Sequence, residues 1–121
     1  MSSADKPLVW VGKSLDELKG FPKQVMSVMG YALRQAQMGE KHVDAKPLAG
    51  YSGAGVLEIV EDHDGDTYRA VYTVRFAQVV YVLHAFQKKS KAGIKTPQED
   101  VKLIAERLKR AQADYESRGT P

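Results

Sequence analysis

The stretch TYRAVYTVRF, residues 67–76, alternates between two kinds of side chain along its length. Its odd and even positions form two groups: Tyr68, Ala70, Tyr72, Val74 and Phe76 on one face, and Arg69, Val71, Thr73 and Arg75 on the other. Successive side chains of a β-strand point to opposite faces of a sheet, so this period of two predicts a strand. The mainly aromatic and apolar face should pack on a core.

Two further strands are expected beside this one. Residues 56–61 have strand-like composition, and HDGD, residues 63–66, is a turn signal that joins them to the central stretch. Residues 79–86 are nearly all apolar, which predicts a buried central strand with His84 and Phe86 on the same side as Val80 and Val82. The three strands form an antiparallel meander.

The remainder of the chain predicts one more strand and several helices. Residues 8–11 indicate a short strand, Ser14 and Glu17 form a capping-box pattern, and Pro22 suits the start of a second helix. That helix has apolar residues at helical spacing: Val25, Met29, Leu33 and Ala36. Residues 40–55 are polar and glycine-rich, which predicts a loop, and residues 96–99 predict the start of a last helix.

These elements predict an α+β fold in a single domain, residues 1–121, with flexible ends at residues 1–7 and 114–121. We expect a small antiparallel sheet of about four strands, mixed at one edge, with the helices packed on one face. The opposite face would then be open to an elongated ligand.

Composition limits the possible classes of protein. The 121 residues include no cysteine, which excludes thiol catalysis and disulfide scaffolds and fits a cytoplasmic protein. No apolar run is long enough to span a membrane, and the first residues lack the apolar region of a signal peptide. The net charge is +3, but residues 86–121 carry nine Lys or Arg against five Asp or Glu. A basic segment on a near-neutral body favours contact with a polyanion.

Two superficial motifs do not meet the requirements of their sites. GYSGAG, residues 50–55, lacks the Gly-Lys-Ser/Thr ending of a phosphate-binding loop. Asp62, Asp64 and Asp66 have the spacing of a calcium loop, but Thr73 stands where the last acidic ligand is required. No histidine and acidic cluster has the spacing of a metal site, so we expect neither a metal nor a cofactor.

Several stretches together resemble one known family. They are ALRQAQMG at residues 32–39, KPL at 46–48, VLEI at 56–59, YRAVY at 68–72, YVLHAFQKKS at 81–90 and KTP at 95–97. In this order and at these distances, they are similar to the HigB-like, phage-derived branch of the RelE toxin superfamily. The resemblance spans residues 8–110, and its most specific part is residues 83–97.

The resemblance implies a function and partners. It implies a RelE-like sheet and a toxin of a type II toxin–antitoxin system, a ribosome-dependent endoribonuclease that cleaves mRNA in the decoding site. It also implies a cognate antitoxin, often a helix-turn-helix protein, in addition to the ribosome and mRNA.

Cleavage by the 2′-hydroxyl requires proton removal, neutralisation of the phosphate and protonation of the leaving oxygen. We predict three catalytic residues: Arg69 as a phosphate clamp, His84 as an acid or base, and Lys88. Further contacts to RNA or the ribosome are predicted at Arg75, Phe86, Lys89, Lys91 and Lys95. The alternatives are an arginine on an exposed sheet face, a core histidine, a core phenylalanine and a solvated lysine loop.

One departure from the family leaves the general base open. Other RelE-like toxins carry lysines on the strand before the Tyr-Arg element, where this chain has Glu58 and Glu61. Glu58 is either a base or an outward-facing surface carboxylate. The missing lysines also favour an alternative function, a catalytically inactive module that binds RNA or protein.

Overall fold

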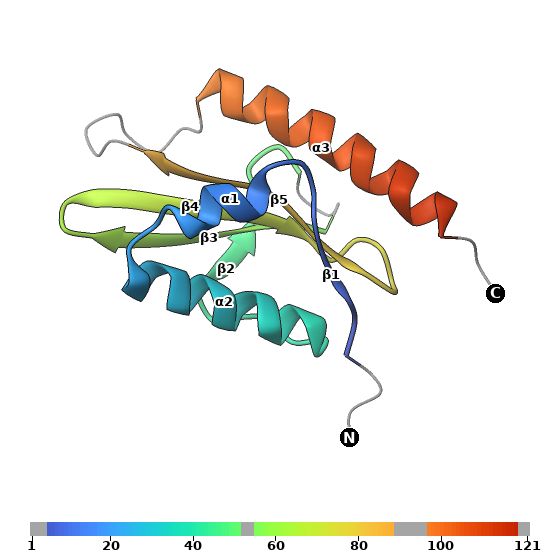
Figure 1. Cartoon of the computed structure of the whole chain (residues 1–121), viewed down its shortest axis with the longest axis horizontal. Helices are drawn as coiled ribbons and strands as arrows, with labels where there is room; N and C mark the ends of the chain where they lie inside the picture. Colours follow the sequence, from blue (N-terminus) through green and yellow to red (C-terminus); the bar gives the residue numbers. More distant parts are fainter. Residues whose placement is uncertain (1–4, 52–54, 89–96, 119–121) are drawn as a thin grey trace.

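The computed structural model describes residues 5–51, 55–88 and 97–118 (Figure 1). In chain order, the elements are β1 (Leu8–Trp10), α1 (Ser14–Lys19), α2 (Lys23–Gln37), β2 (Ala45–Pro47), β3 (Val56–His63), β4 (Asp66–Thr73), β5 (Val80–Lys88) and α3 (Gln98–Ser117). Helix α3 thus includes residues 114–117, which we expected in a flexible end. Within the described ranges, none of the helices has both the length and the apolar character needed to cross a membrane.

The strands form one mixed sheet in the order β1-β5-β4-β3-β2. Strand β1 runs parallel to β5, and the other neighbouring pairs are antiparallel. The predicted meander β3-β4-β5 and its mixed edge are confirmed. The turn between β3 and β4 is tight because Asp64 and Gly65 both take positive φ angles, 52° and 85°.

The number of strands was underestimated because β2 lies in the segment predicted to be a loop. Residues Ala45–Pro47 pair with Leu57–Ile59 of β3 and form an outer edge of the sheet. Only Ala45 is buried, while Lys46 and Pro47 are exposed. A strand of three residues with one apolar contact leaves no periodicity that sequence reasoning can detect.

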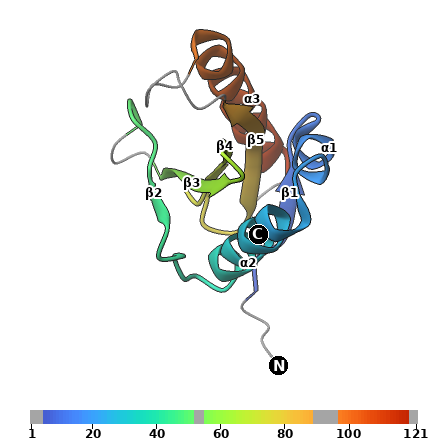
Figure 2. The ribbon, with the colours of Figure 1, turned by 90° about the vertical axis from the view of Figure 1, so that its left-hand side faces the viewer.

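The prediction that the helices pack on one face was wrong, because α3 lies on the opposite side of the sheet from α2 (Figures 1 and 2). One core joins α1 and α2 to the sheet, with Leu18, Met29, Leu33, Ile59, Tyr72 and Val82 among its members. A second core lies under α3, with Val71, Tyr81, Leu83, Ile104 and Ala111 among its members. Residues Val80 to Leu83 of β5 contribute apolar side chains alternately to both cores, so both faces of the sheet need a cover.

A bulge in β5 changes which side chains share a face. Val71 pairs with His84, but the next residue of β4, Tyr72, pairs with Val82, so Leu83 is an extra residue. Phe86 therefore packs in the core under α3, while Val80 and Val82 pack in the other core. The prediction that His84 and Phe86 share a face with Val80 and Val82 was therefore wrong. Phe76 also differs from expectation, because β4 ends at Thr73 and Phe76 turns into the core under α3.

Candidate functional site

A buried ion pair lies on the face of the sheet that α3 partly covers. Nη1 of Arg69, on β4, donates to Oε1 of Glu58, on β3, over 2.8 Å. The two residues are only 7% and 6% exposed, so water screens their attraction little. The alternative in which Glu58 is an outward surface carboxylate is thus wrong. Nε of Arg69 is buried and has no hydrogen-bond partner within the described residues, which is an uncommon state for a buried donor.

An aromatic side chain lies beside this pair. Phe86 on β5 is the direct cross-strand partner of Arg69. Its ring stacks on the imidazole of His84, with 4.7 Å between the ring centroids and 21° between the planes. Phe86 is half-buried, so part of its ring stays accessible. The structure therefore brings together three of the predicted site residues, Arg69, His84 and Phe86.

Glu58 and His84 lie in one row across the sheet. Glu58 pairs with Val71 of β4, and Val71 pairs with His84 of β5. Since neighbouring strands are about 5 Å apart, the backbones of Glu58 and His84 are separated by about 10 Å. Arg69 occupies the next position along β4 on that face. A phosphate beside Arg69 could thus have a carboxylate on one side and an imidazole on the other.

His84 is buried, and both of its ring nitrogens face carboxylates. Nδ1 lies 3.0 Å from Oε1 of Glu17 in α1, and Nε2 lies 2.6 Å from Oδ1 of Asp100 in α3. The residue is 5% exposed. The ring of His84, on β5, thus contacts both α1 and α3. His84 is buried, as the core-histidine alternative expected, and it also lies beside the candidate site.

Arg107 of α3 completes this cluster. Its Nη1 and Nη2 donate to the two carboxylate oxygens of Glu17 at 2.9 and 3.1 Å, and Nη1 also donates to the carbonyl of Leu83. Burial raises the pKa of Glu17, but hydrogen bonds from Arg107, His84 and the amide of Ala85 outweigh that effect and hold the pKa below its ordinary value. Glu17 is therefore ionised at neutral pH.

Sequence reasoning missed the three partners Glu17, Asp100 and Arg107. The predicted capping box assigned Glu17 to the start of α1, but Ser14 donates to the carbonyl of Val82, and Lys13 at the N-cap makes no side-chain capping bond. The signal that could have found Glu17 and Arg107 is their position on the buried sides of two amphipathic helices, where a charged residue needs a partner.

Arg75, another predicted site residue, does not lie with these residues. Arg75 follows the end of β4, is exposed, and has its guanidinium carbon 5.9 Å from the centre of the Phe76 ring. It does not extend a strip from Arg69 along one strand, because β4 ends at Thr73. The backbone of Lys88 pairs with Thr67 at the end of β5. Lys89, Lys91 and Lys95 lie outside the described residues.

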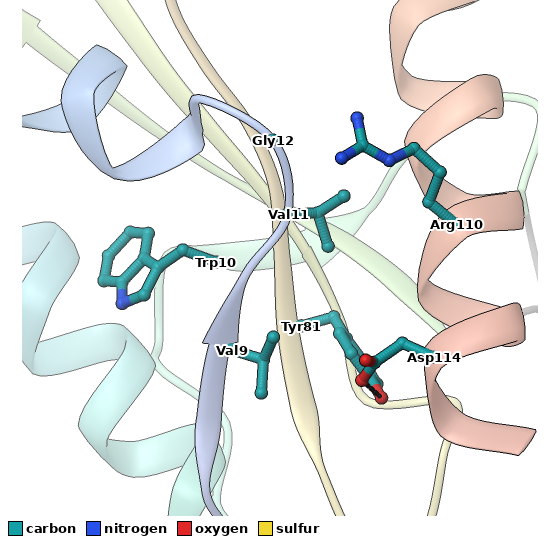
Figure 3. A pocket seen from close by; sticks show the side chains of 7 residues that line it. All are labelled: Val9, Trp10, Val11, Gly12, Tyr81, Arg110 and Asp114. Atoms are coloured by element: carbon teal, nitrogen blue, oxygen red, sulfur yellow. Dashed lines mark hydrogen bonds between the residues drawn. The ribbon is translucent and has the colours of Figure 1, made fainter. Parts of the chain in front are cut away.

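A pocket of about 250 Å³ lies between β1 and the later turns of α3 (Figure 3). Its lining includes Arg110, Asp114 and Tyr81, and the hydroxyl of Tyr81 donates to Asp114 over 2.7 Å. Among the residues that the structure describes, none of the predicted catalytic or RNA-binding residues lines it. The sheet face with Arg69 and Glu58 therefore remains the candidate site.

Comparison with solved structures shows the fold. A doubly substituted form of E. coli toxin RelE in the free state is similar over 88% of this chain and 97% of that chain, with a TM-score of 0.54 and 19% identity. The RelBE2 toxin–antitoxin complex from Mycobacterium tuberculosis covers 72% of this chain and 95% of its own, with a TM-score of 0.46 and 16% identity. The predicted RelE-like α+β fold is confirmed by the first of these.

Comparison with sequences shows the family. Among curated proteins, none matches the chain. Residues 16–109 match the family described as phage-derived protein Gp49-like, DUF891, which is well over half of the chain and includes Glu17, the β3-β4-β5 meander and most of α3. The phage-derived relationship expected from the sequence is thus confirmed, and the chain belongs to the Gp49-like family.

Proposed function

We propose that this chain is the toxin of a type II toxin–antitoxin system, a cytoplasmic endoribonuclease that cleaves mRNA on the ribosome and so inhibits translation. The observation that carries the proposal is the pair of Arg69 and Glu58 beside Phe86, on a sheet whose fold is that of a RelE toxin. A cognate antitoxin, of the helix-turn-helix type, is the expected protein partner.

The chemistry divides among the residues of this face. Glu58 accepts the proton of the 2′-hydroxyl, whose oxygen attacks the adjacent phosphorus. Arg69 donates to the nonbridging oxygens as negative charge builds there, since its planar fork fits two oxygens at once. Phe86 stacks on a neighbouring base. The phosphorus–oxygen bond to the 5′ side then breaks, giving a 2′,3′-cyclic phosphate and a 5′-hydroxyl.

His84 is the candidate for protonating the departing 5′ oxygen. It lies in the same row as Glu58, on the far side of β4, which suits an acid and a base acting on opposite sides of one phosphate. Its Nε2 must exchange Asp100 for the departing oxygen. The ribosome supplies the alignment of the mRNA, which accounts for much of the rate in such a reaction.

A second function is favoured by one observation, the internal neutralisation of Arg69 by Glu58. An arginine already paired with a carboxylate attracts a phosphate less strongly than a free one. A catalytically inactive module that binds RNA or a protein partner would not need a free arginine on this face.

The two functions are separated by primer extension on a reporter mRNA in a purified translation system. Wild type is compared with Arg69→Lys, which keeps the charge but loses the fork, with Arg34→Lys on α2 as a matched control, and with a reaction without ribosomes. We expect codon-phased cuts that need ribosomes and are lost only in Arg69→Lys. Folded wild type that makes no cuts supports the inactive module.

A further inference from the structure

The pocket between β1 and the later turns of α3 lies apart from the candidate site (Figure 3). Val9 and Val11 of β1 give it an apolar wall, and Arg110 and Asp114 line it from α3. Its volume of about 250 Å³ is smaller than the roughly 300–1,000 Å³ of pockets that enclose a whole small molecule. The pocket therefore has room for one unit of a longer chain.

Arg110 brings a positive charge to this pocket. In Figure 3, its side chain extends from α3 toward Gly12. Within the part of the chain that the structure describes, its guanidinium makes no hydrogen bond or ion pair. The residues outside the described ranges include no Asp or Glu, so no other acidic side chain is left to neutralise it. An arginine without a carboxylate partner attracts an anion.

A second guanidinium group lies at the same end of the pocket. Nη1 of Arg110 and Nε of Arg107 lie 3.3 and 3.0 Å from the point that a Cβ atom on Gly12 would occupy. Glu17 and the carbonyl of Leu83 accept only from the Nη atoms of Arg107, and its Nε is buried without a partner among the described residues. The end of the pocket at Gly12 is thus rich in N–H donors and poor in acceptors.

The other end of the pocket holds an acceptor. Oδ2 of Asp114 accepts from the hydroxyl of Tyr81 over 2.7 Å and from Nε of Arg118 over 2.8 Å, whereas Oδ1 accepts from no side chain within the described ranges. Hydrogen bonds from the same two donors hold the pKa of Asp114 below its ordinary value, so the carboxyl group is ionised at neutral pH. Oδ1 is therefore suited to a hydroxyl donor of a ligand.

The spacing of the two ends limits the kind of ligand. Arg110 and Asp114 are one turn apart on α3, about 6 Å along the helix axis. A ligand that spans them needs an anion, a hydroxyl group close to it, and carbon atoms that can contact Val9 and Val11. A ribose with its phosphate has these groups in this order.

We propose that this pocket binds one ribose–phosphate unit of single-stranded RNA, with the phosphate on Arg110 and a ribose hydroxyl donating to Oδ1 of Asp114. It is a second RNA contact, which holds a strand away from the sheet face with Arg69 and Glu58. Such binding needs neither ribosomes nor cleavage, so it stands apart from the proposed function. A free ribonucleotide has the same groups, and the test separates the two sources.

The test measures the binding of a short labelled single-stranded RNA by fluorescence anisotropy at several salt concentrations, without ribosomes. Arg110→Gln is compared with Lys109→Gln, since Lys109 is an exposed cation in the same turn of α3. Asp114→Asn is compared with Glu116→Gln, since Glu116 is an exposed acid of the same helix. DNA of the same sequence tests the ribose contact in the unaltered protein, which keeps the proposal falsifiable if Asp114→Asn does not fold.

We expect Arg110→Gln to weaken RNA binding at least about fivefold. The slope of log binding constant against log salt concentration should fall by about 0.7, the value for one phosphate contact of a single strand. The wild type should bind DNA more weakly than RNA, because DNA lacks the 2′-hydroxyl, and Asp114→Asn should weaken the binding of RNA alone. Both controls should bind RNA as the wild type does.

Amide signals in ¹H–¹⁵N spectra locate the bound strand. RNA should shift the amides of Val11 and Gly12 in the wild type and in Lys109→Gln, but not in Arg110→Gln. AMP and inorganic phosphate are titrated separately. We expect AMP to shift the same amides only at much higher concentration than RNA, and phosphate alone to have little effect.

Equal losses of RNA binding in Arg110→Gln and Lys109→Gln would overturn the proposal, because the attraction would then belong to a charged surface and not to the pocket. DNA bound as tightly as RNA would overturn the contact with Asp114. Shifts with AMP but not with RNA would overturn RNA as the source and assign the pocket to a free ribonucleotide. Failure of the proposed function gives a different result, in which the wild type makes no cuts on the ribosome while RNA still shifts Val11 and Gly12.

Discussion

Oε1 of Glu58, on β3, lies 2.8 Å from Nη1 of Arg69, on β4, and both side chains are more than nine-tenths buried. Their neighbours in sequence point into the opposite core, since Ile59 and Ala70 pack with α1 and α2. The pair therefore holds two charges on a sheet face whose adjoining part is apolar. This relationship determines both the stability of the hairpin and the chemistry that the face can perform.

Replacing one partner of the pair should lower the free energy of unfolding strongly, whereas replacing both partners should lower it little. Arg69→Met leaves Glu58 buried without a partner, and we expect a loss of about 3–5 kcal/mol in the free energy of unfolding. The double variant Glu58→Leu with Arg69→Met should recover most of that loss. Urea unfolding measures both. Arg34→Met, at an exposed arginine that pairs with the partly buried Asp5, serves as control and should change stability by about 1 kcal/mol or less. Additive losses in the double variant would contradict this account.

Both cores should contribute comparably to stability, because helices cover both faces of the sheet. Ile104 in α3 and Met29 in α2 are each fully buried. We expect Ile104→Ala and Met29→Ala to cost about 2–5 kcal/mol each. Lys102→Ala, on the exposed side of α3, should change stability by less than about 0.5 kcal/mol. A negligible effect of Ile104→Ala would mean that α3 is not part of the folded core.

The lowered pKa of Glu17 predicts a pH-dependent contribution to stability. A carboxyl group with a lower pKa in the folded state stabilises the protein above its ordinary value of 4.5, and loses that contribution as the pH falls through the folded value. The difference in unfolding free energy between wild type and Glu17→Gln should be largest at neutral pH. It should narrow as the pH falls below about 4.5.

Denaturant unfolding at several pH values between 7 and 3 checks this prediction. Glu106→Gln, at an exposed site of α3, controls for the general loss of a carboxylate and should show no such difference. A difference between wild type and Glu17→Gln that stays constant down to pH 3 would assign the effect of the substitution to packing instead.

Arg75 should act in binding and not in the chemical step, because it is exposed and lies beyond the end of β4. We expect Arg75→Ala to raise the KM for ribosome-bound mRNA and leave kcat unchanged. If it contacts one phosphate, the slope of log binding constant against log salt concentration should fall by about one. Arg34→Ala, on α2 at the other face, should leave the slope unchanged. An altered kcat in Arg75→Ala would place the residue closer to the reaction.

Most of the fold could be predicted from the spacing of apolar residues, because that spacing shows which side chains of one strand or helix are buried together. The alternation at residues 67–76 and the turn at residues 63–66 correctly gave the β3-β4 hairpin and the faces of Tyr68 and Arg69. It failed at Phe86, whose face depends on the bulge at Leu83. The spacing also failed to place α3 on its side of the sheet, because an apolar run such as residues 79–86 does not show which helix covers which face.

The candidate site was predicted in part for a related reason. Arg69 and Phe86 follow from a motif and a strand register, which are local features. Glu17 is 67 residues from His84 and 90 from Arg107, so their contacts depend on the docking of α1 and α3. Predicting the ion pair of Glu58 with Arg69 would have required the register of β3 on β4, which the turn and the lengths of both strands together determine.

The most direct test of the central proposal is single-turnover cleavage of ribosome-bound mRNA by Glu58→Gln, with Glu61→Gln on the same strand as control. If Glu58 is the general base, Glu58→Gln should bind the ribosome as the wild type does and cleave at least about 100-fold more slowly. Glu61→Gln should cleave normally. Cleavage by Glu58→Gln at the wild-type rate or faster would contradict the account, because Glu58 would then serve only to neutralise Arg69.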